Sequence, residues 1–256
     1  MSKSMNFIRF GLLAAMMSLP LGAAAKDNDV SVVLVHGAFS DGSAWHKVIP
    51  ILQDAGVSVS AAQLPLSSLE GDAAVVSRLV DLQQGAVVLV GHSYGGNVIT
   101  EAGANDNVEA LVYVAGFALD AGQALTDLLK GRPPAPWQAE AVRDEGGYVR
   151  LTAKGVSTYF APDLPAEEAA LVAATQGPIQ YKINTQAPAV AAWSMHPTYY
   201  VLTKNDQIVP PKLQGFFAKR MGAEVTAVEA SHVAMLAQPE AVAEVILGAV
   251  EAASAD

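Results

Sequence analysis

Short runs of β-branched and other apolar residues alternate along the chain with longer segments in which apolar residues recur every three to four positions. Runs of the first kind predict strands, the longer segments predict helices, and their alternation is typical of βαβ units in a parallel sheet. The predicted strands are 30–36, 57–61, 86–91, 108–115, 198–203 and 224–228. The predicted helices are 43–55, 72–83, 94–103, 211–221 and 239–252. We therefore expect an α/β fold with a six-stranded, mostly parallel sheet and helices on both faces.

The alternation stops between about residues 117 and 195, where prolines separate short Ala-rich pieces. We interpret this stretch as a small cap inserted into one domain that covers residues 26–256. One helix is expected from 163 to about 175, because a proline and two glutamates lie near its start. Five aromatic residues of the cap are expected either to line a pocket or to pack the cap onto the core, and the sequence leaves both readings open: Trp137, Tyr148, Tyr159, Phe160 and Trp193.

Residues 1–25 have the composition of a secretory signal peptide. Lys3 and Arg9 are basic, residues 10–21 are an apolar stretch, and Ala23-Ala24-Ala25 provides a small-residue cleavage site. A membrane anchor is the alternative, but it needs about 20 apolar residues, and this stretch is shorter and contains Pro20. The sequence predicts cleavage after Ala25 and an exported, periplasmic or secreted protein without stable membrane insertion.

Composition narrows the class of protein. Hydrophobic residues make up 52% of the 256 residues and charged residues 16%, which excludes a disordered chain. The net charge of −10 provides no basic stripe for phosphates, so nucleic acid is not an expected partner. The chain has no cysteine, which removes disulfides, thiol nucleophiles and zinc–thiolate sites. Helices rich in Ala and Val leave a homodimer open.

A candidate nucleophile lies between a predicted strand and a predicted helix. The sequence Gly91-His92-Ser93-Tyr94-Gly95 follows the apolar run 86–90 and precedes the helical run 97–102. A serine on such a sharp turn needs small residues on both sides, and this arrangement is a nucleophile elbow. The pentapeptide alone is a weak signal, because a chain of this length contains one by chance in about one case in ten. Its place between a strand and a helix makes Ser93 the predicted nucleophile.

Two further residues complete a predicted catalytic triad. His232 lies in the loop between the last predicted strand and the last helix, where the base is expected. Asp206 follows the strand 198–203 and is the expected acid, although an Asx turn would also explain it. Asp120, after the strand 108–115, is the rival acid. We favour Asp206, because it keeps the chain order Ser, Asp, His. A neutral histidine base predicts that turnover falls in acid.

The loop after the first strand is expected to complete an oxyanion hole. In this arrangement the donors are the backbone N–H groups of Ala38 and Tyr94. His36 and His92 are expected to be structural, with His92 pointing away from the nucleophile. His46 and His196 have no plausible partner in the sequence. The predicted chemistry needs neither a metal ion nor an organic cofactor.

Three stretches resemble the plant methylesterases and hydroxynitrile lyases and their bacterial esterase-like relatives: His36-Gly37-Ala38, residues 91–96 and residues 231–236. The resemblance implies the α/β-hydrolase fold, a compact cap over the serine and small carboxylic esters as substrates. The lyases of this group have a threonine at the position of Gly37 and a lysine directly after the catalytic histidine. In this chain Gly37 takes the place of the threonine and Val233 takes the place of the lysine, so both departures favour an esterase.

The sequence therefore predicts a serine hydrolase that cleaves small carboxylic esters through an acyl-enzyme intermediate. By resemblance, a cofactor-free perhydrolase or haloperoxidase-like enzyme shares the same triad and stays open as an alternative. A lyase that uses the triad as acid and base is disfavoured by Gly37 and Val233. A binding protein of the same fold would have no need of Ser93, Asp206 and His232 together.

Overall fold

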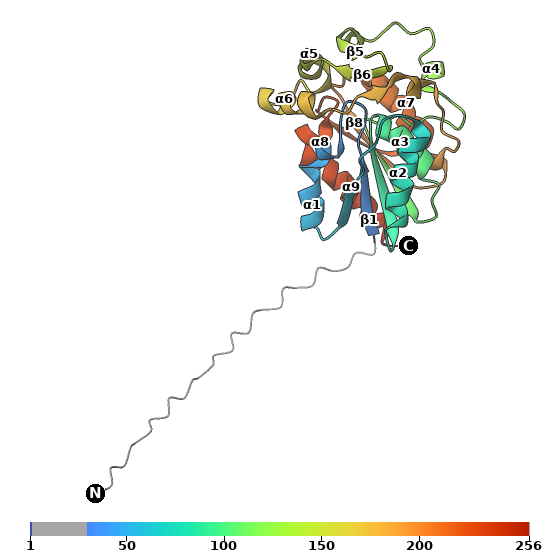
Figure 1. The fold of residues 1–256 in the computed structure, drawn as a ribbon. Helices are drawn as coiled ribbons and strands as arrows, with labels where there is room; N and C mark the ends of the chain where they lie inside the picture. Colours follow the sequence, from blue (N-terminus) through green and yellow to red (C-terminus); the bar gives the residue numbers. More distant parts are fainter. Residues whose placement is uncertain (2–29, 256) are drawn as a thin grey trace.

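The computed structural model describes residue 1 and residues 30–255 (Figure 1). Apart from residue 1, the predicted signal peptide and its cleavage site lie outside the described residues. Within the described part of the chain, none of the helices combines the length and the apolar character that crossing a membrane requires.

A six-stranded sheet forms the centre of the fold, with the strand order β2-β1-β3-β4-β8-β9. All of its neighbouring strands are parallel, as the alternating pattern predicts. Residues 32–35, 87–90 and 111–114 are fully buried, because helices cover both faces of the sheet. The strands are β1 (Val30–Val35), β2 (Ser58–Ala61), β3 (Ala86–His92), β4 (Val108–Val114), β8 (Thr198–Thr203) and β9 (Glu224–Val228).

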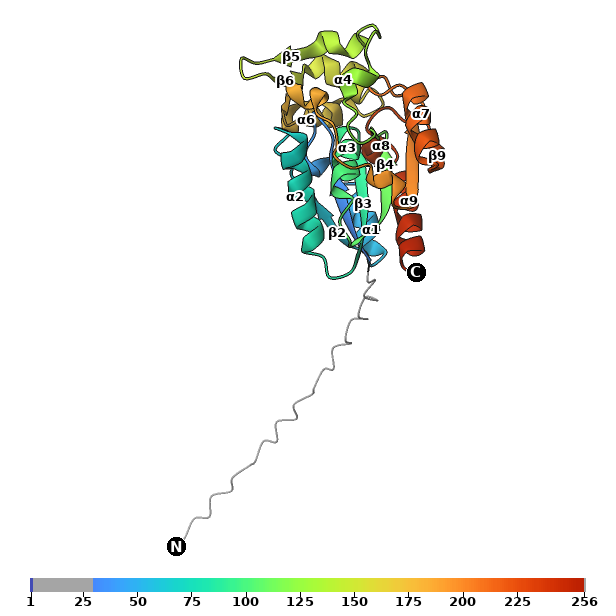
Figure 2. The same cartoon turned by 90° about the vertical axis from the view of Figure 1, so that its right-hand side faces the viewer.

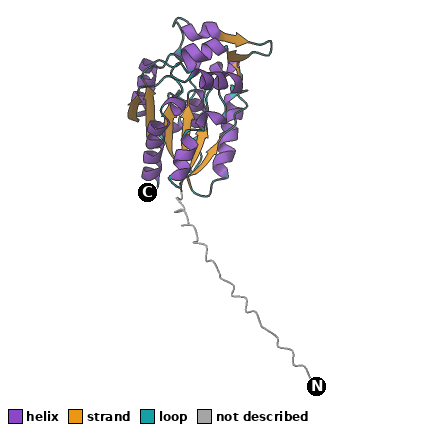
Figure 3. Cartoon of the chain, turned by 90° about the vertical axis from the view of Figure 1, so that its left-hand side faces the viewer, coloured by secondary structure: helices purple, strands orange, loops and turns teal. Residues whose placement is uncertain are grey.

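Helices pack on both sides of this sheet, as Figures 1 and 3 show. Helices α1 (Val48–Asp54) and α9 (Pro239–Ala253) cover one face. Helices α2 (Leu69–Asp81), α3 (Tyr94–Ala102) and α7 (Pro211–Met221) cover the other. The α/β fold class, the six strands and the five helices that flank them are confirmed.

Two helices begin at other residues than the pattern predicts, for local chemical reasons. The expected helix 43–55 is divided into the 3₁₀ turn η1 (Gly42–Trp45) and α1. Pro50 lacks the N–H that a continuous helix would use to bond residue 46, so the α-helix begins only two residues before it. Helix α2 begins three residues early, because the Ser68 hydroxyl accepts a hydrogen bond from the N–H of Gly71 at 3.1 Å and caps it.

The residues between β4 and β8, which we call the 115–197 segment, lie beyond the carboxyl ends of the sheet strands (Figures 1 and 2). The predicted helix is present as α6 (Ala166–Thr175). A three-stranded antiparallel sheet that the sequence does not predict lies beside it, with strands β5 (Ala141–Arg143), β6 (Tyr148–Leu151) and β7 (Ile179–Gln180). The shorter helical elements are α4 (Leu125–Leu128), η2 (Pro136–Glu140), α5 (Ala153–Gly155), η3 (Val156–Phe160), η4 (Tyr181–Thr185) and η5 (Ala192–Ser194).

Candidate active site

Ser93 lies between β3 and α3 in a conformation that few residues adopt. Its φ of 53° and ψ of −120° fall outside the main regions allowed to L-residues, and such strain gathers at functional sites. The turn is possible only because its neighbours are glycines. A Cβ on Gly91 would lie 2.5 Å from the carbonyl oxygen of Gly95, and one on Gly95 would lie 2.5 Å from that of Val35. The structure confirms the steric reason for expecting small residues here.

Gly37 lies directly against the serine. A Cβ at this position would be 2.8 Å from the Cβ of Ser93 and 2.9 Å from the carbonyl oxygen of His92. Both atoms belong to the turn that holds the serine, so neither moves without displacing the serine. This backbone therefore has no room for the threonine that the lyases have at this position, which supports the esterase side of the resemblance.

His232 and Asp206 form a buried pair at the carboxyl ends of the strands. Nδ1 of His232 lies 2.7 Å from Oδ2 of Asp206, and both side chains are 0% exposed. His232 comes from the loop between β9 and the short helix α8 (Ala234–Ala237), and Asp206 from the loop after β8. The carboxylate accepts, so Nδ1 carries the proton. Nε2 is then a free acceptor, and it has no hydrogen-bond partner among the described residues.

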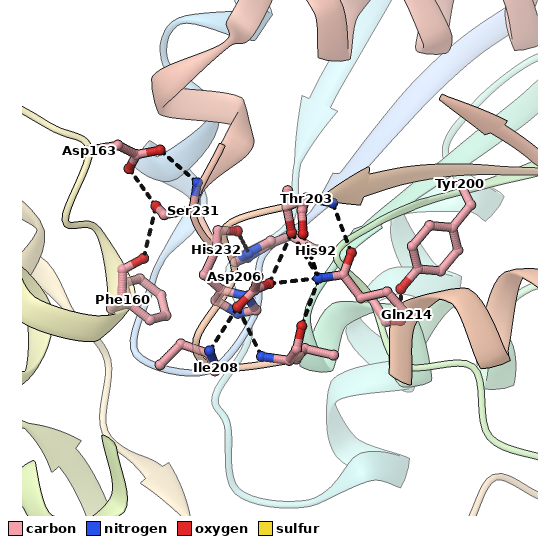
Figure 4. A network of polar contacts seen from close by, with 12 residues as sticks. His92, Phe160, Asp163, Tyr200, Thr203, Asp206, Ile208, Gln214, Ser231 and His232 are labelled. Carbon is pink, nitrogen blue, oxygen red and sulfur yellow. Dashed lines mark hydrogen bonds and ion pairs between the residues drawn. The ribbon is translucent and has the colours of Figure 1, made fainter. Parts of the chain in front are cut away.

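Four donors besides His232 hold the Asp206 carboxylate (Figure 4). Oδ1 accepts the backbone N–H groups of Ile208 and Val209 at 2.8 and 2.9 Å. Oδ2 accepts the Thr203 hydroxyl at 3.0 Å and the Gln214 amide at 2.9 Å. Asp206 is thus both the first residue of an Asx turn and the partner of His232, so both interpretations of this residue hold at once.

Asp120 lies elsewhere. Its carboxylate is half exposed and pairs with the Arg220 guanidinium at 3.0 Å. Its backbone N–H lies 3.4 Å from the side-chain oxygen of Gln123. Of the two candidate acids, the structure brings only Asp206 to the histidine.

His36 and His92 are buried and structural. His36 donates Nδ1–H to the carbonyl of Gly37 at 2.9 Å and accepts the Leu64 N–H at 3.0 Å, and burial lowers its pKa. His92 donates Nε2–H to the carbonyl of His232 at 2.9 Å, and burial together with the neighbouring His232 holds its pKa well below the ordinary value. The rings of His92 and His232 lie 4.6 Å apart. His92 therefore lies against His232 and fixes its backbone.

The remaining two histidines contact backbone carbonyl groups away from this cluster. A ring nitrogen of His46 lies 2.9 Å from the Ser43 carbonyl oxygen, and one of His196 lies 2.8 Å from that of Gly103. Neither histidine lines the cavity described below.

Ala38 and Tyr94 both line the cavity that Ser93 lines. Tyr94 is the first residue of α3, so its N–H has no acceptor within the helix. Its hydroxyl donates to Oδ2 of Asp72 at 2.6 Å, while Oδ1 of Asp72 accepts the N–H of Leu66 at 2.9 Å. Burial raises the pKa of both Tyr94 and Asp72. This anchor of Tyr94 was not predicted from the sequence, although a signal for it exists: Asp72 lies on the apolar stripe of α2 beside Leu69, Ala73 and Val76.

A cavity of about 450 Å³ contains Ser93 and His232 in its wall. Phe39, Trp137 and Phe160 form an aromatic side, with the Phe39 ring centroid 6.1 Å from that of Trp137 and 6.3 Å from that of Phe160. Of the five aromatic residues that the sequence singles out in this segment, Trp137 and Phe160 thus line the cavity, and Phe117 and Tyr181 of the same segment line it as well. Trp193 instead donates its indole N–H to the Leu119 carbonyl at 2.9 Å. The other two, Tyr148 and Tyr159, are not among the lining residues.

The 115–197 segment is joined to the loop that carries His232 (Figure 4). The ring of Phe160 lies 5.2 Å from that of His232. The carboxylate of Asp163 accepts the backbone N–H of Ser231 at 2.6 Å and also the Ser231 hydroxyl. We call these contacts of Phe160 and Asp163 the base clamp. They connect the wall of the cavity to the residue next to the histidine.

Comparison with known proteins places the chain in a family. The model of the alpha/beta hydrolase family matches residues 32–245, which is most of the chain. The chain belongs to the alpha/beta hydrolase family. The fold expected from the resemblance is confirmed. In the part of this hydrolase that the structure describes, no three acidic or histidine side chains gather in a way that would hold a metal ion.

Relatives of the hydrolase include enzymes of the expected branch. A pyrethroid hydrolase of Sphingobium wenxiniae is 26% identical over 245 residues, which cover 84% of this chain and 85% of the relative. Methylesterase 2 of Arabidopsis thaliana is 23% identical over 250 residues and covers 84% of this chain and 94% of the relative. The crystal structure of polyneuridine aldehyde esterase has a TM-score of 0.75 at 21% identity, covering 85% of this chain and 98% of that one. The resemblance to methylesterases and the prediction of a carboxylic ester hydrolase are confirmed.

Proposed function

We propose that this hydrolase cleaves small carboxylic esters through an acyl-enzyme intermediate on Ser93. The observation that carries the proposal is the buried pair of His232 and Asp206, whose Nδ1 and Oδ2 atoms lie 2.7 Å apart. This pairing leaves Nε2 of His232 free, and His232 lines the same cavity as the strained Ser93. The names of the relatives, a pyrethroid hydrolase and a methylesterase, support the same reaction.

Each group has a defined part in the proposed reaction. Nε2 of His232 takes the hydroxyl proton as the Ser93 oxygen attacks the ester carbonyl, and Asp206 stabilises the imidazolium that forms. The N–H groups of Ala38 and Tyr94 donate to the oxygen that becomes negative. His232 then returns the proton to the departing alcohol, which leaves Ser93 acylated. Water, deprotonated by the same histidine, releases the acid and restores the serine.

The cavity favours substrates with an apolar part. Aromatic and aliphatic side chains form most of its wall, and about 450 Å³ is within the usual range for small-molecule sites. Polar side chains interrupt this wall at a few positions, among them Asn97, Gln138 and Asn184. We propose small esters with an aryl or short alkyl group rather than long or highly charged ones.

Burst kinetics test the acyl-enzyme directly. Rapid mixing of the protein from residue 26 onward with p-nitrophenyl acetate is expected to release up to one equivalent of p-nitrophenolate before the steady state whenever deacylation is slower than acylation. An organophosphonate is expected to label Ser93, as peptide mapping by mass spectrometry would show. Absence of the label together with absence of hydrolysis across a panel of p-nitrophenyl and methyl aryl esters would contradict the proposal.

Arg143 is expected to disfavour positively charged substrates. Apart from His232, it is the only basic or acidic side chain among the described residues that line the cavity, and its guanidinium is stacked 4.7 Å above the ring of Tyr181. We expect Arg143→Gln to improve hydrolysis of a choline ester relative to its neutral 3,3-dimethylbutyl isostere by about fivefold, the effect of ~1 kcal/mol between exposed charges. Competition assays with both esters measure the ratio.

Arg132→Gln is the control for this test, because Arg132 is an exposed arginine of the same segment that does not line the cavity. It should leave the ratio unchanged. An equal change in both variants would mean that net charge, rather than Arg143, sets the preference.

Export is a separate proposal, and it is supported by the basic, apolar and small-residue parts of residues 1–25. Expression of the full chain in a bacterium, followed by fractionation and intact-mass analysis, tests it. A mature protein that begins at Lys26 outside the cytoplasm is the expected result. Retention of the first residues on a cytoplasmic protein would contradict it.

A further inference from the structure

Gln214 is a buried polar residue on the apolar side of α7. Its side chain is fully buried, and it lies on the same stripe of the helix as Phe217, Ala218 and Met221. A buried amide without hydrogen-bond partners would cost folding free energy, so the partners of Gln214 indicate its role. All of its hydrogen bonds go to Thr203 at the end of β8 or to the loop after it, which carries Asp206 (Figure 4).

The surroundings fix the orientation of this amide. Its oxygen accepts the backbone N–H of Thr203 at 2.9 Å. Its nitrogen lies 2.7 Å from the carbonyl oxygen of Val209, 2.8 Å from the Thr203 hydroxyl and 2.9 Å from Oδ2 of Asp206. A carbonyl and a carboxylate accept but do not donate, so the amide nitrogen must face them. Gln214 thus joins both ends of the loop to the carboxylate between them.

Gln214 acts on the oxygen that faces the base. Oδ2 of Asp206 accepts Nδ1–H of His232, the Thr203 hydroxyl and the Gln214 amide, whereas Oδ1 accepts backbone N–H groups only. A donor on Oδ2 competes with Nδ1–H for the same lone pairs. It therefore both orients the carboxylate and weakens its hold on the histidine proton.

We propose that Gln214 is a positioning residue that sets how strongly Asp206 holds and charges His232. The inference rests on the proposed function, in which His232 must be neutral to accept the serine proton. Too strong an acceptor at Oδ2 would keep the imidazolium form at neutral pH and leave Nε2 without a free lone pair. Gln214 shares Oδ2 with the histidine proton, and it therefore limits how strongly the carboxylate stabilises the imidazolium.

Other polar groups around His232 do not replace this contact. His92 on β3 contacts the ring and bonds the backbone of His232. Asp163 in the 115–197 segment bonds the neighbouring Ser231. The hydroxyl of Tyr200 on β8 donates to the Gly116 carbonyl. Burial and the nearby Asp206 carboxylate raise the pKa of Tyr200 well above its ordinary value, so this hydroxyl stays neutral. Ser93 shares the cavity wall with the base, and so do other polar side chains, of which Arg143 is the charged one.

The experiment compares Gln214→Leu with the parent enzyme. We expect kcat for p-nitrophenyl acetate to fall by about 10- to 100-fold, the effect of losing a hydrogen bond to a charged group, with little change in KM. The acid limb of the profile of kcat/KM against pH should move to higher pH, because the imidazolium becomes more stable. NMR titration of protein labelled with ¹⁵N-histidine should show the same displacement for His232.

The NMR readout needs no turnover, so it tests Gln214 even if no ester is hydrolysed, and the two proposals fail separately. Thr203→Val removes another donor to Oδ2 and should move the His232 titration in the same direction if Gln214→Leu does not fold. Gln207→Leu, an exposed neighbour in the same loop, is the control and should change neither readout. A loss of activity or stability in Gln214→Leu with an unchanged His232 titration would overturn the proposal.

Discussion

Ser93→Ala is expected to lower the turnover of p-nitrophenyl esters by about 10⁴- to 10⁶-fold while the protein stays folded. The substitution removes only the hydroxyl group, whose oxygen is the proposed nucleophile in the cavity. The proposed oxyanion donors and the cavity wall stay in place, so substrate binding should survive. Alanine keeps the backbone at a φ of 53°, so the strain at the elbow is not relieved. Steady-state kinetics and a thermal melt measure the two effects.

A matched control is Ser254→Ala at the end of α9, where the hydroxyl donates to the Val250 carbonyl at 2.7 Å. It should hydrolyse the same esters at the parent rate. If Ser93→Ala retained most of the parent activity after purification to homogeneity, the nucleophile would have to be another group.

Asp206→Asn is expected to lower kcat by about 10⁴-fold, the loss known for this exchange in a Ser-His-Asp triad. The amide oxygen would be drawn to the N–H groups of Ile208 and Val209, and the NH₂ group would then face Nδ1 of His232. A donor at that position forces the ring proton onto Nε2, so the histidine can no longer accept from serine. Ester hydrolysis by the purified variant measures the loss.

Asp120→Asn provides the comparison, because Asp120 is the rival acid in the sequence. It would lose only a half-exposed ion pair with Arg220, a contact worth about 0–1 kcal/mol in stability. Turnover should match that of the parent enzyme. A large loss in Asp120→Asn with a small one in Asp206→Asn would reassign the acid.

Much of the fold and the candidate site could be predicted, because strands and helices alternate regularly along the chain outside the 115–197 segment. Parallel strands place their carboxyl ends at one edge of the sheet, so residues just after strands lie close together. Ser93 follows β3, Asp206 follows β8 and His232 follows β9. Strand ends and the chain order of serine, acid and histidine were therefore enough to select these three.

The partners of these residues could not be predicted, because they depend on contacts between distant elements. Gln214 and Asp72 are single polar residues on apolar stripes, a pattern that indicates a buried hydrogen bond without naming its partner. The position of His92 against His232 depends on how two loops meet. Strands β5, β6 and β7 have two to four residues each, too few to show alternation.

The base clamp affects how this enzyme could acquire new substrates. Phe160 lines the cavity and contacts His232, and three residues later Asp163 holds Ser231. Grafting the 115–197 segment of a relative onto this protein would replace residues that line the cavity and the base clamp at the same time. A chimera that omits an acid at 163 would lose rate on every ester, and this loss would be mistaken for poor recognition. Recombination libraries should therefore keep positions 160, 163 and 231 as one inherited block.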